Sequence, residues 1–409
     1  MYDIEEIRKQ FPMLNKKIKM QGKPLVFLDN ASTTFKPQCV IDAVNKYYTE
    51  ETANSHRGDY DLCATVDATV RACRATVAKF VNSDVDEVVF TNGDTMSLNI
   101  VAYGYGLKHL KAGDEIILSD GEHASNVLPW FQVSKMTGAK IVYVPLDKEG
   151  RILHENLEKV MNKNTKVVSL AHVGNVLGYK LNVKKIAEIC HRFGAIFVVD
   201  GAQSVPHFTT DFKDWDIDFL TFSGHKLCAP TGIGCLIGKK ALLDDMDPIL
   251  VGGGMNEIFT KPNNLVPFEA PVKFEAGTLN IAGIYGLKAA IEFLLSIGMD
   301  EIAQHEGKLK KYIVEKLKGR NIIIYNANSE AGILTFNIPN TFPQDEATYL
   351  NYKGIAVRSG QHCDKLLNDF LCAPATCRAS FYLYTTYEEV DALVNELLNG
   401  GDILDAYFN

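Results

Sequence analysis

The chain lacks the features that mark several large classes of protein. No apolar run approaches the roughly 20 residues of a transmembrane helix, and the start has no basic segment followed by an apolar one, as a secretory signal would. Repeats, low-complexity tracts and long linkers are also absent. The formal net charge of -8 excludes the basic field that non-specific nucleic-acid binding requires. We therefore expect a cytoplasmic protein that binds neither membranes nor nucleic acid.

The number and spacing of the cysteines argue against both a disulfide framework and a zinc site. There are 9 of them, an odd number, and no two form a Cys-X-X-Cys pair. This argues against a disulfide framework and favours a reducing compartment. The only cluster is Cys363, Cys372 and Cys377, whose spacing does not match common zinc sites. We expect no metal site, and expect most of the remaining cysteines to lie in the core.

What the sequence does contain is a regular alternation of apolar, β-branched runs with helical periodicity, from about residue 85 to residue 240. Such repetition predicts an α/β fold with a mainly parallel sheet between helices. The predicted strands are Glu87–Thr91, Glu115–Ser119, Lys140–Pro145, Lys166–His172, Ala195–Asp200, Phe219–Ser223 and Gly234–Ile237. The predicted helices between them include Met96–Lys108, Asn126–Met136 and Val183–Phe193.

The pattern changes past residue 240. Val251–Gly254 and Pro262–Pro271 resemble loops. The remaining predicted elements are helices at Ile284–Ser296, Glu301–Lys318 and Glu388–Leu398 and strands at Ile322–Tyr325 and Gly332–Ile338. We predict a large α/β domain over residues 17–290, and a smaller α+β domain formed by residues 1–16 and 291–409 that carries Cys363 and Arg378.

Two predicted buried strands end in residues that a pyridoxal-phosphate (PLP) enzyme needs. One ends at Asp200, and the other leads through Ser223 and His225 to Lys226. In such enzymes an acid keeps the pyridine nitrogen protonated, and a lysine forms a Schiff base with the aldehyde. Gln203 could reach the ring hydroxyl, while Ser223 and His225 could hold the phosphate. Alone, Asp200 would be a helix cap and Lys226 a surface lysine; together, they favour the cofactor.

Other polar residues could contact the same cofactor. Asn92–Thr95 follows a predicted strand and opens a helix, whose N-terminus suits a phosphate. A plain capping turn is an equally good explanation. His123 could stack on a flat ring, although a single loop histidine is more often only a polar residue. Thr278 could bind a phosphate or cap the next helix.

Two residues near the end of the chain suggest more specific chemistry. Cys363 follows His362 and has Arg358 nearby, a setting that can favour a reactive thiolate. A structural cysteine is the simpler alternative. Arg378 lies beside the apolar run Phe381–Tyr384, so it needs an anionic partner. A substrate carboxylate and a structural ion pair are equally good candidates.

These residues together resemble one family. The chain is similar to the class V aminotransferase-like enzymes of fold type I, which are PLP-dependent transferases, and within them to the group II, or Suf-type, cysteine desulfurases. The resemblance covers nearly the whole chain. The matching motifs are Leu28–Thr34, Asn54–Gly58, Glu122-His123, Asn175–Gly178, Asp200–Gln203, Ser223–Lys226, Phe274–Thr278, Arg358–Cys363 and Arg378–Tyr384.

The resemblance implies a role for each matching residue. Lys226 would bind the cofactor aldehyde and move protons at the substrate α-carbon, Asp200 would pair with the pyridinium, and His123 would stack on the ring. Cys363 would take sulfur from the substrate, and Arg378 would bind the substrate carboxylate. The other implied contacts are Gln203 and Asn175 around the ring hydroxyl and the substrate, Thr95, Ser223 and His225 at the phosphate, Thr278 at the phosphate of the other subunit, and Asn30, His56 and Arg358 along the active site.

The implied reaction converts L-cysteine to L-alanine and leaves the sulfur as a persulfide on Cys363. A sulfur-acceptor protein of the SufE or SufU type would then take the sulfur for iron–sulfur cluster assembly on a scaffold. The family also implies a homodimer. Three alternatives stay open: a selenocysteine lyase, another class V PLP enzyme, and a catalytically weak binding partner in cluster assembly.

The chain departs from the family pattern at four places. Gln361 replaces one of two usual histidines, and Asp364 adds a negative charge that should oppose thiolate formation at Cys363. Asn92–Thr95 replaces a more usual Arg-Gly-Thr-Thr, so the phosphate end has one cation fewer. Gly174 stands where a serine is common. None of these changes removes a catalytic group.

Overall fold

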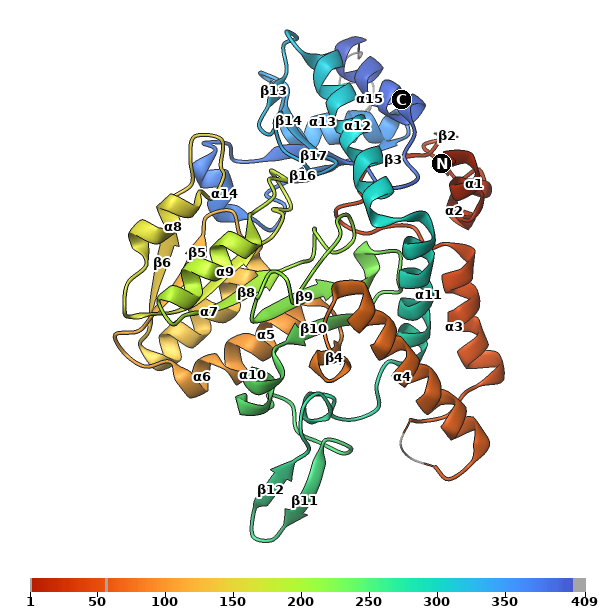
Figure 1. The fold of residues 1–409 in the computed structure, drawn as a ribbon. Helices are drawn as coiled ribbons and strands as arrows, with labels where there is room; N and C mark the ends of the chain where they lie inside the picture. Colours follow the sequence, from red (N-terminus) through yellow and green to blue (C-terminus); the bar gives the residue numbers. More distant parts are fainter. Residues whose placement is uncertain (1, 56–57, 400–409) are drawn as a thin grey trace.

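The computed structural model describes residues 2–55 and 58–399, and a seven-stranded sheet forms its centre (Figure 1). The strand order is β4-β10-β9-β8-β7-β5-β6. β10 is antiparallel to both neighbours, whereas the strands from β9 to β6 pair in parallel. The predicted α/β fold with a mainly parallel mixed sheet is confirmed. The strands are β4 (Val88–Thr91), β5 (Glu115–Ser119), β6 (Lys140–Val144), β7 (Thr165–Ala171), β8 (Ile196–Asp200), β9 (Phe219–Ser223) and β10 (Gly234–Gly238).

The carboxyl ends of six of these strands share one edge of the sheet. β4 and β9 are both antiparallel to β10, so β4 runs in the same direction as β9 and its parallel neighbours. Thr91, Asp200 and Ser223 are the last residues of β4, β8 and β9. Ligands of such sheets bind beyond the carboxyl ends of the strands, so this edge is where a site is expected.

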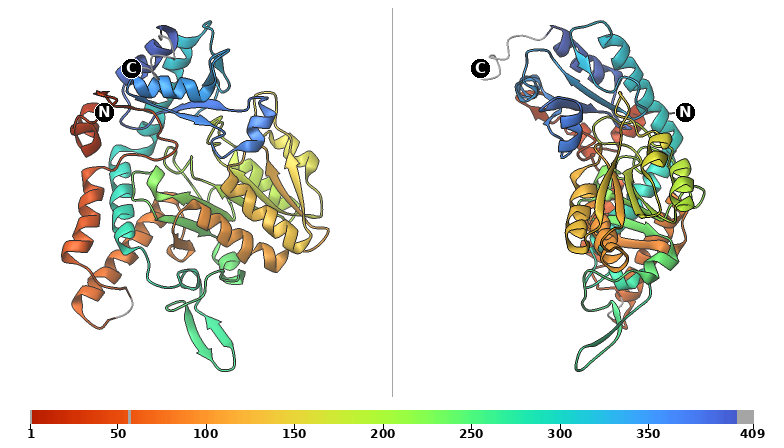
Figure 2. Two further views of the ribbon diagram at one scale, coloured as in Figure 1. Left: turned by 180° about the vertical axis from the view of Figure 1, so that it is seen from behind. Right: turned by 90° about the vertical axis from the view of Figure 1, so that its left-hand side faces the viewer.

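Helices cover both faces of the central sheet (Figure 1 and Figure 2). Alternate strand residues point to opposite faces, and the core divides accordingly: Phe90 packs in one cluster and Val89 in the other. Burial on both faces explains why the strands are continuous apolar runs. The first cluster includes residues of α3 (Gln38–Glu50), α4 (Asp61–Val81), α9 (Val183–Arg192) and α11 (Ile281–Ile297), and the second includes residues of α5 (Asp94–Gly104), α7 (Ala124–Thr137) and α10 (Lys240–Asp245).

A second sheet of four strands lies above the first in the view of Figure 1. Its order is β13-β14-β17-β16, and all its pairs are antiparallel. Leu309, Phe336 and Val390 are among the buried residues that join it to its helices. The elements are β13 (Ile323–Ile324), β14 (Ile333–Asn337), β16 (Arg358–Gly360), β17 (Thr376–Ser380), α12 (Met299–Leu317), α13 (Pro343–Tyr352) and α15 (Tyr387–Asn399).

The start of the chain packs against its end. Arg8 forms an ion pair with Glu389 at 3.0 Å, and β3 (Val26–Phe27) pairs in parallel with β15 (Ile355–Ala356). The predicted division at residues 290 and 291 falls inside the continuous helix α11. The domain boundaries therefore stay a prediction. The remaining N-terminal elements are α1 (Ile4–Lys9), α2 (Pro12–Asn15), β1 (Lys19–Met20) and β2 (Lys23–Pro24).

One predicted loop region is wrong. Pro262–Pro271 contains β12 (Asn264–Pro267), which forms an antiparallel hairpin with β11 (Asn256–Thr260). The hairpin has only two strands, so β12 has a neighbour on one side only. Pro267 can therefore end the strand, because no second neighbour needs the N–H group that proline lacks. Helices that the sequence did not predict include α3, α4, α10, α13, α8 (His154–Val160) and α14 (Lys365–Phe370). The predicted helix Met96–Lys108 is divided between α5 and α6 (Gly106–His109).

Among residues 2–55 and 58–399, no single helix has both the length and the apolar character to cross a membrane. Helices α11 and α12 meet both conditions only when taken together, and they are bent by 73° where they join. Within the same ranges, no three His, Cys, Asp or Glu side chains are grouped in a way that could hold a metal ion.

Candidate active site

A cavity of about 190 Å³ lies at the carboxyl edge of the central sheet. Asp200 and Lys226 line it from the central sheet, and Arg358 and Arg378 line it from the four-stranded sheet. The register of that second sheet places Arg358 directly opposite Arg378 on the neighbouring strands β16 and β17. Residues separated by more than a hundred positions in the sequence therefore share one cavity.

The turn that carries Lys226 is held by the N-terminal segment. Lys226 ends a short 3-10 helix after β9, and the carbonyl of His225 accepts hydrogen bonds from the Thr34 N–H at 3.1 Å and from Lys36 Nζ at 3.0 Å. Burial lowers the pKa of Lys226, although the nearby carboxyl groups of Asp200 and Asp94 oppose that effect. A lowered pKa leaves more of the amine neutral, which is the form that attacks an aldehyde.

An acid and an amide lie at another part of the cavity wall. Asp200 is 4% exposed, and its Oδ1 accepts a hydrogen bond from the Ala202 N–H at 2.9 Å. Gln203 donates to the Ala31 carbonyl at 2.7 Å, while its own Oε1 is buried without a hydrogen-bond partner in the described chain. Burial raises the pKa of Asp200, and Lys226 opposes this. A positively charged ring nitrogen beside Asp200 would stabilise its ionised form.

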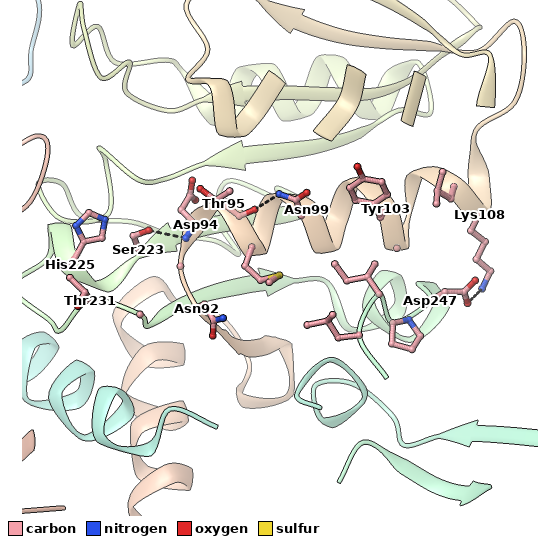
Figure 3. A pocket seen from close by; sticks show the side chains of 18 residues that line it. Asn92, Asp94, Thr95, Asn99, Tyr103, Lys108, Ser223, His225, Thr231 and Asp247 are labelled. Carbon is pink, nitrogen blue, oxygen red and sulfur yellow. Dashed lines mark hydrogen bonds and ion pairs between the residues drawn. The ribbon is translucent and has the colours of Figure 1, made fainter. Parts of the chain in front are cut away.

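The start of α5 forms the hydroxyl-rich end of the cavity, and Figure 3 shows Asp94, Thr95, Ser223 and His225 around this helix end. Ser223 Oγ accepts a hydrogen bond from the Asp94 N–H at 2.8 Å, and Thr95 Oγ1 lies 2.8 Å from Ser125 Oγ. His225 lines the same end, and burial, helped by Lys226, lowers its pKa to about 4. Its imidazole is therefore neutral at pH 7. This end offers a phosphate a helix N-terminus, hydroxyls and a neutral ring.

His123 lies at the cavity wall as the N-cap of α7, and its Nδ1 accepts a hydrogen bond from the Ser125 N–H at 3.1 Å. This bond fixes the orientation of the imidazole. Burial and the charge of Lys226 lower the pKa of His123 to about 4, so the ring is uncharged at neutral pH. An uncharged, fixed ring suits stacking on a flat cofactor.

Arg378 is 1% exposed and is held from several sides. It donates to the Asn175 carbonyl at 2.9 Å and to Ser32 Oγ at 3.0 Å, and it pairs with Asp29 at 3.3 Å. Burial lowers its pKa to about 10, so it stays charged at neutral pH. Its Nε is buried without a partner in the described ranges, so it makes a structural ion pair and keeps an unused donor as well.

Cys363 lies beside the cavity and not inside it. It is exposed, and its Sγ lies 3.6 Å from an Arg358 nitrogen. Its carbonyl accepts a hydrogen bond from the Ala124 N–H at 2.8 Å, and the preceding carbonyl of His362 accepts one from Asn175 Nδ2 at 3.0 Å. The cysteine loop is thus docked against the same elements that carry the cavity.

Two residues next to Cys363 behave differently from what the sequence indicated. His362 is buried and bonded to Thr376, and burial lowers its pKa to about 3, so it is not a cation beside the thiol. The positive charge that contacts the thiol belongs to Arg358. Asp364 is 1% exposed, and burial followed by the charge of Glu122 raises its pKa well above the usual value. Burial therefore opposes the negative charge that the sequence indicated at Asp364.

Two predicted site residues, Asn30 and Thr278, do not line the cavity. Asn30 is fully buried but does not line the cavity, because its amide bonds to the Ser380 carbonyl at 2.8 Å and supports the neighbouring residues that do. Thr278 is exposed and its Oγ1 accepts from Asn54 Nδ2 at 3.3 Å, away from this cavity. His56 lies outside the described residues.

The sequence analysis did not assign site roles to Ser32, Asp94 or Ser125, which all line the cavity. Ser32 belongs to a matched motif, and Asp94 was noted only as a cap and a departure from the family. A hydroxyl or carboxyl that follows a strand end is a signal for such residues, but it cannot tell which way the side chain points.

The cavity fits PLP on the chemistry of its donors. It has an acid for a ring nitrogen, a lysine of lowered pKa for an aldehyde, and a helix N-terminus with hydroxyls for a phosphate. Gln203 Oε1 and Arg378 Nε, both buried and unpartnered in the described chain, need a polar ligand. Asp200, His123 and Lys226 would hold the ring, and Thr95, Ser223 and His225 the phosphate.

Comparisons with known proteins agree with this chemistry. The family model described as aminotransferase class-V matches residues 26–393. A probable cysteine desulfurase of Halalkalibacterium halodurans is 46% identical over 394 residues, which cover 96% of each chain. The crystal structure of the cysteine desulfurase CsdA from Escherichia coli is 35% identical with a TM-score of 0.90, covering 97% of this chain and 98% of that one. An apo cysteine desulfurase from Thermococcus onnurineus is 36% identical with a TM-score of 0.91, at the same coverage.

Proposed function

Because the chain belongs to the aminotransferase class-V family and is a PLP-dependent cysteine desulfurase, we propose that it takes sulfur from L-cysteine as a persulfide on Cys363 and releases L-alanine. The observation that carries the proposal is the contact between Cys363 Sγ and Arg358 at 3.6 Å. Arg358 lines the same cavity as Lys226 and Asp200, so the thiol lies at the mouth of the cavity.

The first step is to bind and orient the amino acid. Arg378 is charged, buried and has an unused Nε donor, so it binds the substrate carboxylate in the cavity. PLP, when bound, supplies an electron sink that stabilises negative charge at the substrate α-carbon. Lys226 Nζ then takes the α-proton, because its lowered pKa leaves more of the amine unprotonated.

The second step is the transfer of sulfur. The Cys363 thiolate attacks the substrate sulfur, so an S–S bond forms while the bond between sulfur and the β-carbon breaks. The electron pair of that bond stays with the organic fragment, which takes up a proton to become alanine. Arg358 lies 3.6 Å from the Cys363 sulfur, so its positive charge lies beside the attacking group. The sulfur is oxidised and the β-carbon reduced, so no external oxidant is needed.

The experiment is mass spectrometry of the protein after incubation with L-cysteine. We expect one added sulfur atom on Cys363 and equimolar alanine in single turnover. Cys363→Ala should lose both, and Cys372→Ala, which removes another exposed thiol, is the matched control. Unchanged alanine formation in Cys363→Ala would contradict the persulfide step.

We also propose a homodimer that completes the site. Thr278 is exposed and does not line the cavity of its own chain, so a second copy must bring it to a phosphate. A wider cavity of about 1150 Å³ runs along α5 from Thr95 toward Lys108, and it leaves this face open to such a copy (Figure 3). Mixing Lys226→Ala with Thr278→Ala protein should restore activity, because one mixed site would then hold both residues. If the mixture stays inactive, the proposal that Thr278 serves the site of the other subunit is contradicted.

The exposed position of Cys363 also supports transfer to another protein. We propose that an acceptor of the SufE or SufU type takes the sulfur in the cytoplasm and passes it to a scaffold for iron–sulfur cluster assembly. Sulfur-35 on Cys363 should move to such an acceptor and not to an acceptor that lacks its own cysteine. Retention of the label on Cys363 would contradict this.

A further inference from the structure

Asp94 is a second buried carboxyl group in the cavity, and the reaction does not use it. It is the first residue of α5 and is 6% exposed. Its N–H donates to Ser223 Oγ at 2.8 Å, while its Oδ1 is buried without a hydrogen-bond partner in the described chain. Figure 3 shows Asp94 grouped with Thr95, Ser223 and His225. A buried, unpartnered oxygen at this position requires an explanation.

The charged groups around Asp94 do not neutralise a negative charge on its carboxyl group. Asp200 at the end of β8 and Lys226 after β9 oppose each other, and both act on Asp94. His123 at the start of α7 and His225 beside Lys226 are uncharged at neutral pH, because burial lowers the pKa of each to about 4.

Within residues 2–55 and 58–399, Lys226 is the cation whose charge acts on Asp94. Ser223 of β9 lines the cavity near Asp94 and carries no charge, and Arg358 and Arg378 line it from the other sheet. Lys108 lies at the far end of the α5 cavity, where it pairs with Asp245 and Asp247 (Figure 3). Among the described residues, Lys226 thus opposes the charge of Asp200 on Asp94, but burial has the larger effect.

A phosphate bound at the same helix end would add negative charge beside this carboxyl group. Two like charges in a buried site strongly disfavour ionisation of the weaker acid. Burial, and then the charge of Asp200, raises the pKa of Asp94 to about 8 even without a phosphate. At pH 7 the group is therefore mainly a neutral acid that can donate a hydrogen bond.

We propose that Asp94 is a positioning residue that binds the cofactor phosphate end as a neutral acid, so that loss of its proton releases the cofactor. The proposal rests on the PLP dependence stated above. The family pattern has an arginine at this end of the site, and this chain does not. In its place, the proton on Asp94 would let the carboxyl group donate a hydrogen bond to the phosphate.

Proton linkage gives the direction in which cofactor affinity changes with pH. If the bound state requires the protonated acid, affinity is full below the pKa of Asp94 in the free protein and is lost as the pH rises through it. The dissociation constant should then rise by up to about tenfold per pH unit above about pH 8. No change is expected from this group between pH 6 and pH 7.

The experiment titrates protein freed of cofactor with pyridoxamine 5'-phosphate, which carries the ring and the phosphate but cannot link to Lys226. Binding is followed by fluorescence from pH 6.5 to pH 9.5 for the wild type, Asp94→Asn and Asp94→Thr. Relative to both variants, the wild type should weaken about tenfold per pH unit above about pH 8. Pyridoxamine, which lacks the phosphate, should show no such divergence.

Thr95→Ala is the matched control, because it removes a hydroxyl at the same helix end without removing a titrating group. Its affinity should fall by a similar factor at every pH and keep the wild-type slope. Circular dichroism confirms that each variant is folded. Parallel profiles for wild type and Asp94→Asn would overturn the role of Asp94. Failure of the wild type to bind pyridoxamine 5'-phosphate at any pH would instead overturn the proposed PLP site.

Discussion

At the residue scale, burial decides what the side chains near Cys363 can do. His362 and Asp364 flank the cysteine in sequence, and their types suggest a cation and an anion. Both are buried, and burial disfavours the charged form of each. The charge that contacts the thiol therefore comes from Arg358, which lies on a different element.

Replacing Asp364 with Asn tests this account through the pH dependence of stability. An Asp whose folded pKa is raised stabilises the fold only below its unfolded pKa of about 4, and that contribution is lost as the pH rises toward the folded pKa. The penalty grows by up to about 1.4 kcal/mol per pH unit for one group. The melting temperature of Asp364→Asn, relative to that of the wild type, should therefore rise between pH 5 and pH 8. A constant gap between the two curves would show that Asp364 is already ionised.

At the element scale, close contact between strands sets the start of α5. A Cβ added at Gly234 on β10 would lie 2.5 Å from the Gly93 Cα and 2.5 Å from the Phe222 carbonyl oxygen. Gly93 itself has a φ of 146° and is the N-cap of α5. Gly234 needs glycine because two backbones approach each other there, and Gly93 needs it because other residues rarely adopt its positive φ. The helix end that offers N–H groups to a phosphate depends on this packing.

Gly234→Ala should therefore weaken cofactor binding and lower stability, by about 1–3 kcal/mol as overpacking does. Gly307→Ala in α12 is the matched control, because its Cβ would meet nothing within 4 Å and alanine favours a helix. PLP retained after dialysis and the melting temperature of each variant are the measurements. Equal behaviour of the two variants would show that the contact at Gly234 relaxes at no cost.

At the scale of the whole molecule, distant parts of the chain close the site together. Arg8 binds Glu389 through two nitrogens, at 3.0 and 3.1 Å, and also bonds to the Tyr384 carbonyl. The Tyr384 hydroxyl in turn donates to Asn30. Asn30 precedes Ala31 and Ser32, which line the cavity. The first helix is thus connected to the active site through the end of the chain.

Arg8→Ala should destabilise the protein by about 2 kcal/mol, because it breaks a largely buried bidentate pair and leaves Glu389 without its partner. Lys9→Ala removes the neighbouring pair with Glu6, which is exposed on both sides, and should cause no measurable change. Thermal unfolding of both variants at low and high salt is the measurement. An equal loss in both would mean that the N-terminal helix is held by something other than this pair.

Much of the fold could be predicted from apolar periodicity, because strands buried on both faces leave continuous apolar runs. β5 and β9 match their predicted bounds, Glu115–Ser119 and Phe219–Ser223. The hairpin of β11 and β12 could not be predicted in this way, because most of its residues are exposed and show no alternation of buried and exposed positions. Helices α3 and α4 were not proposed, although α4 buries Val66, Val70 and Val77 along one side.

The sequence by itself determined the chemical inventory of this protein: an acid and a lysine at the ends of buried strands, a cysteine and an arginine far along the chain, and the family to which they belong. Only the tertiary structure decided which of these groups meet and which carry charge. Sequence order says nothing about the register that sets Arg358 opposite Arg378. It also says nothing about the burial that raises the pKa of Asp94 and of Asp364, since charge depends on the surroundings that the fold supplies.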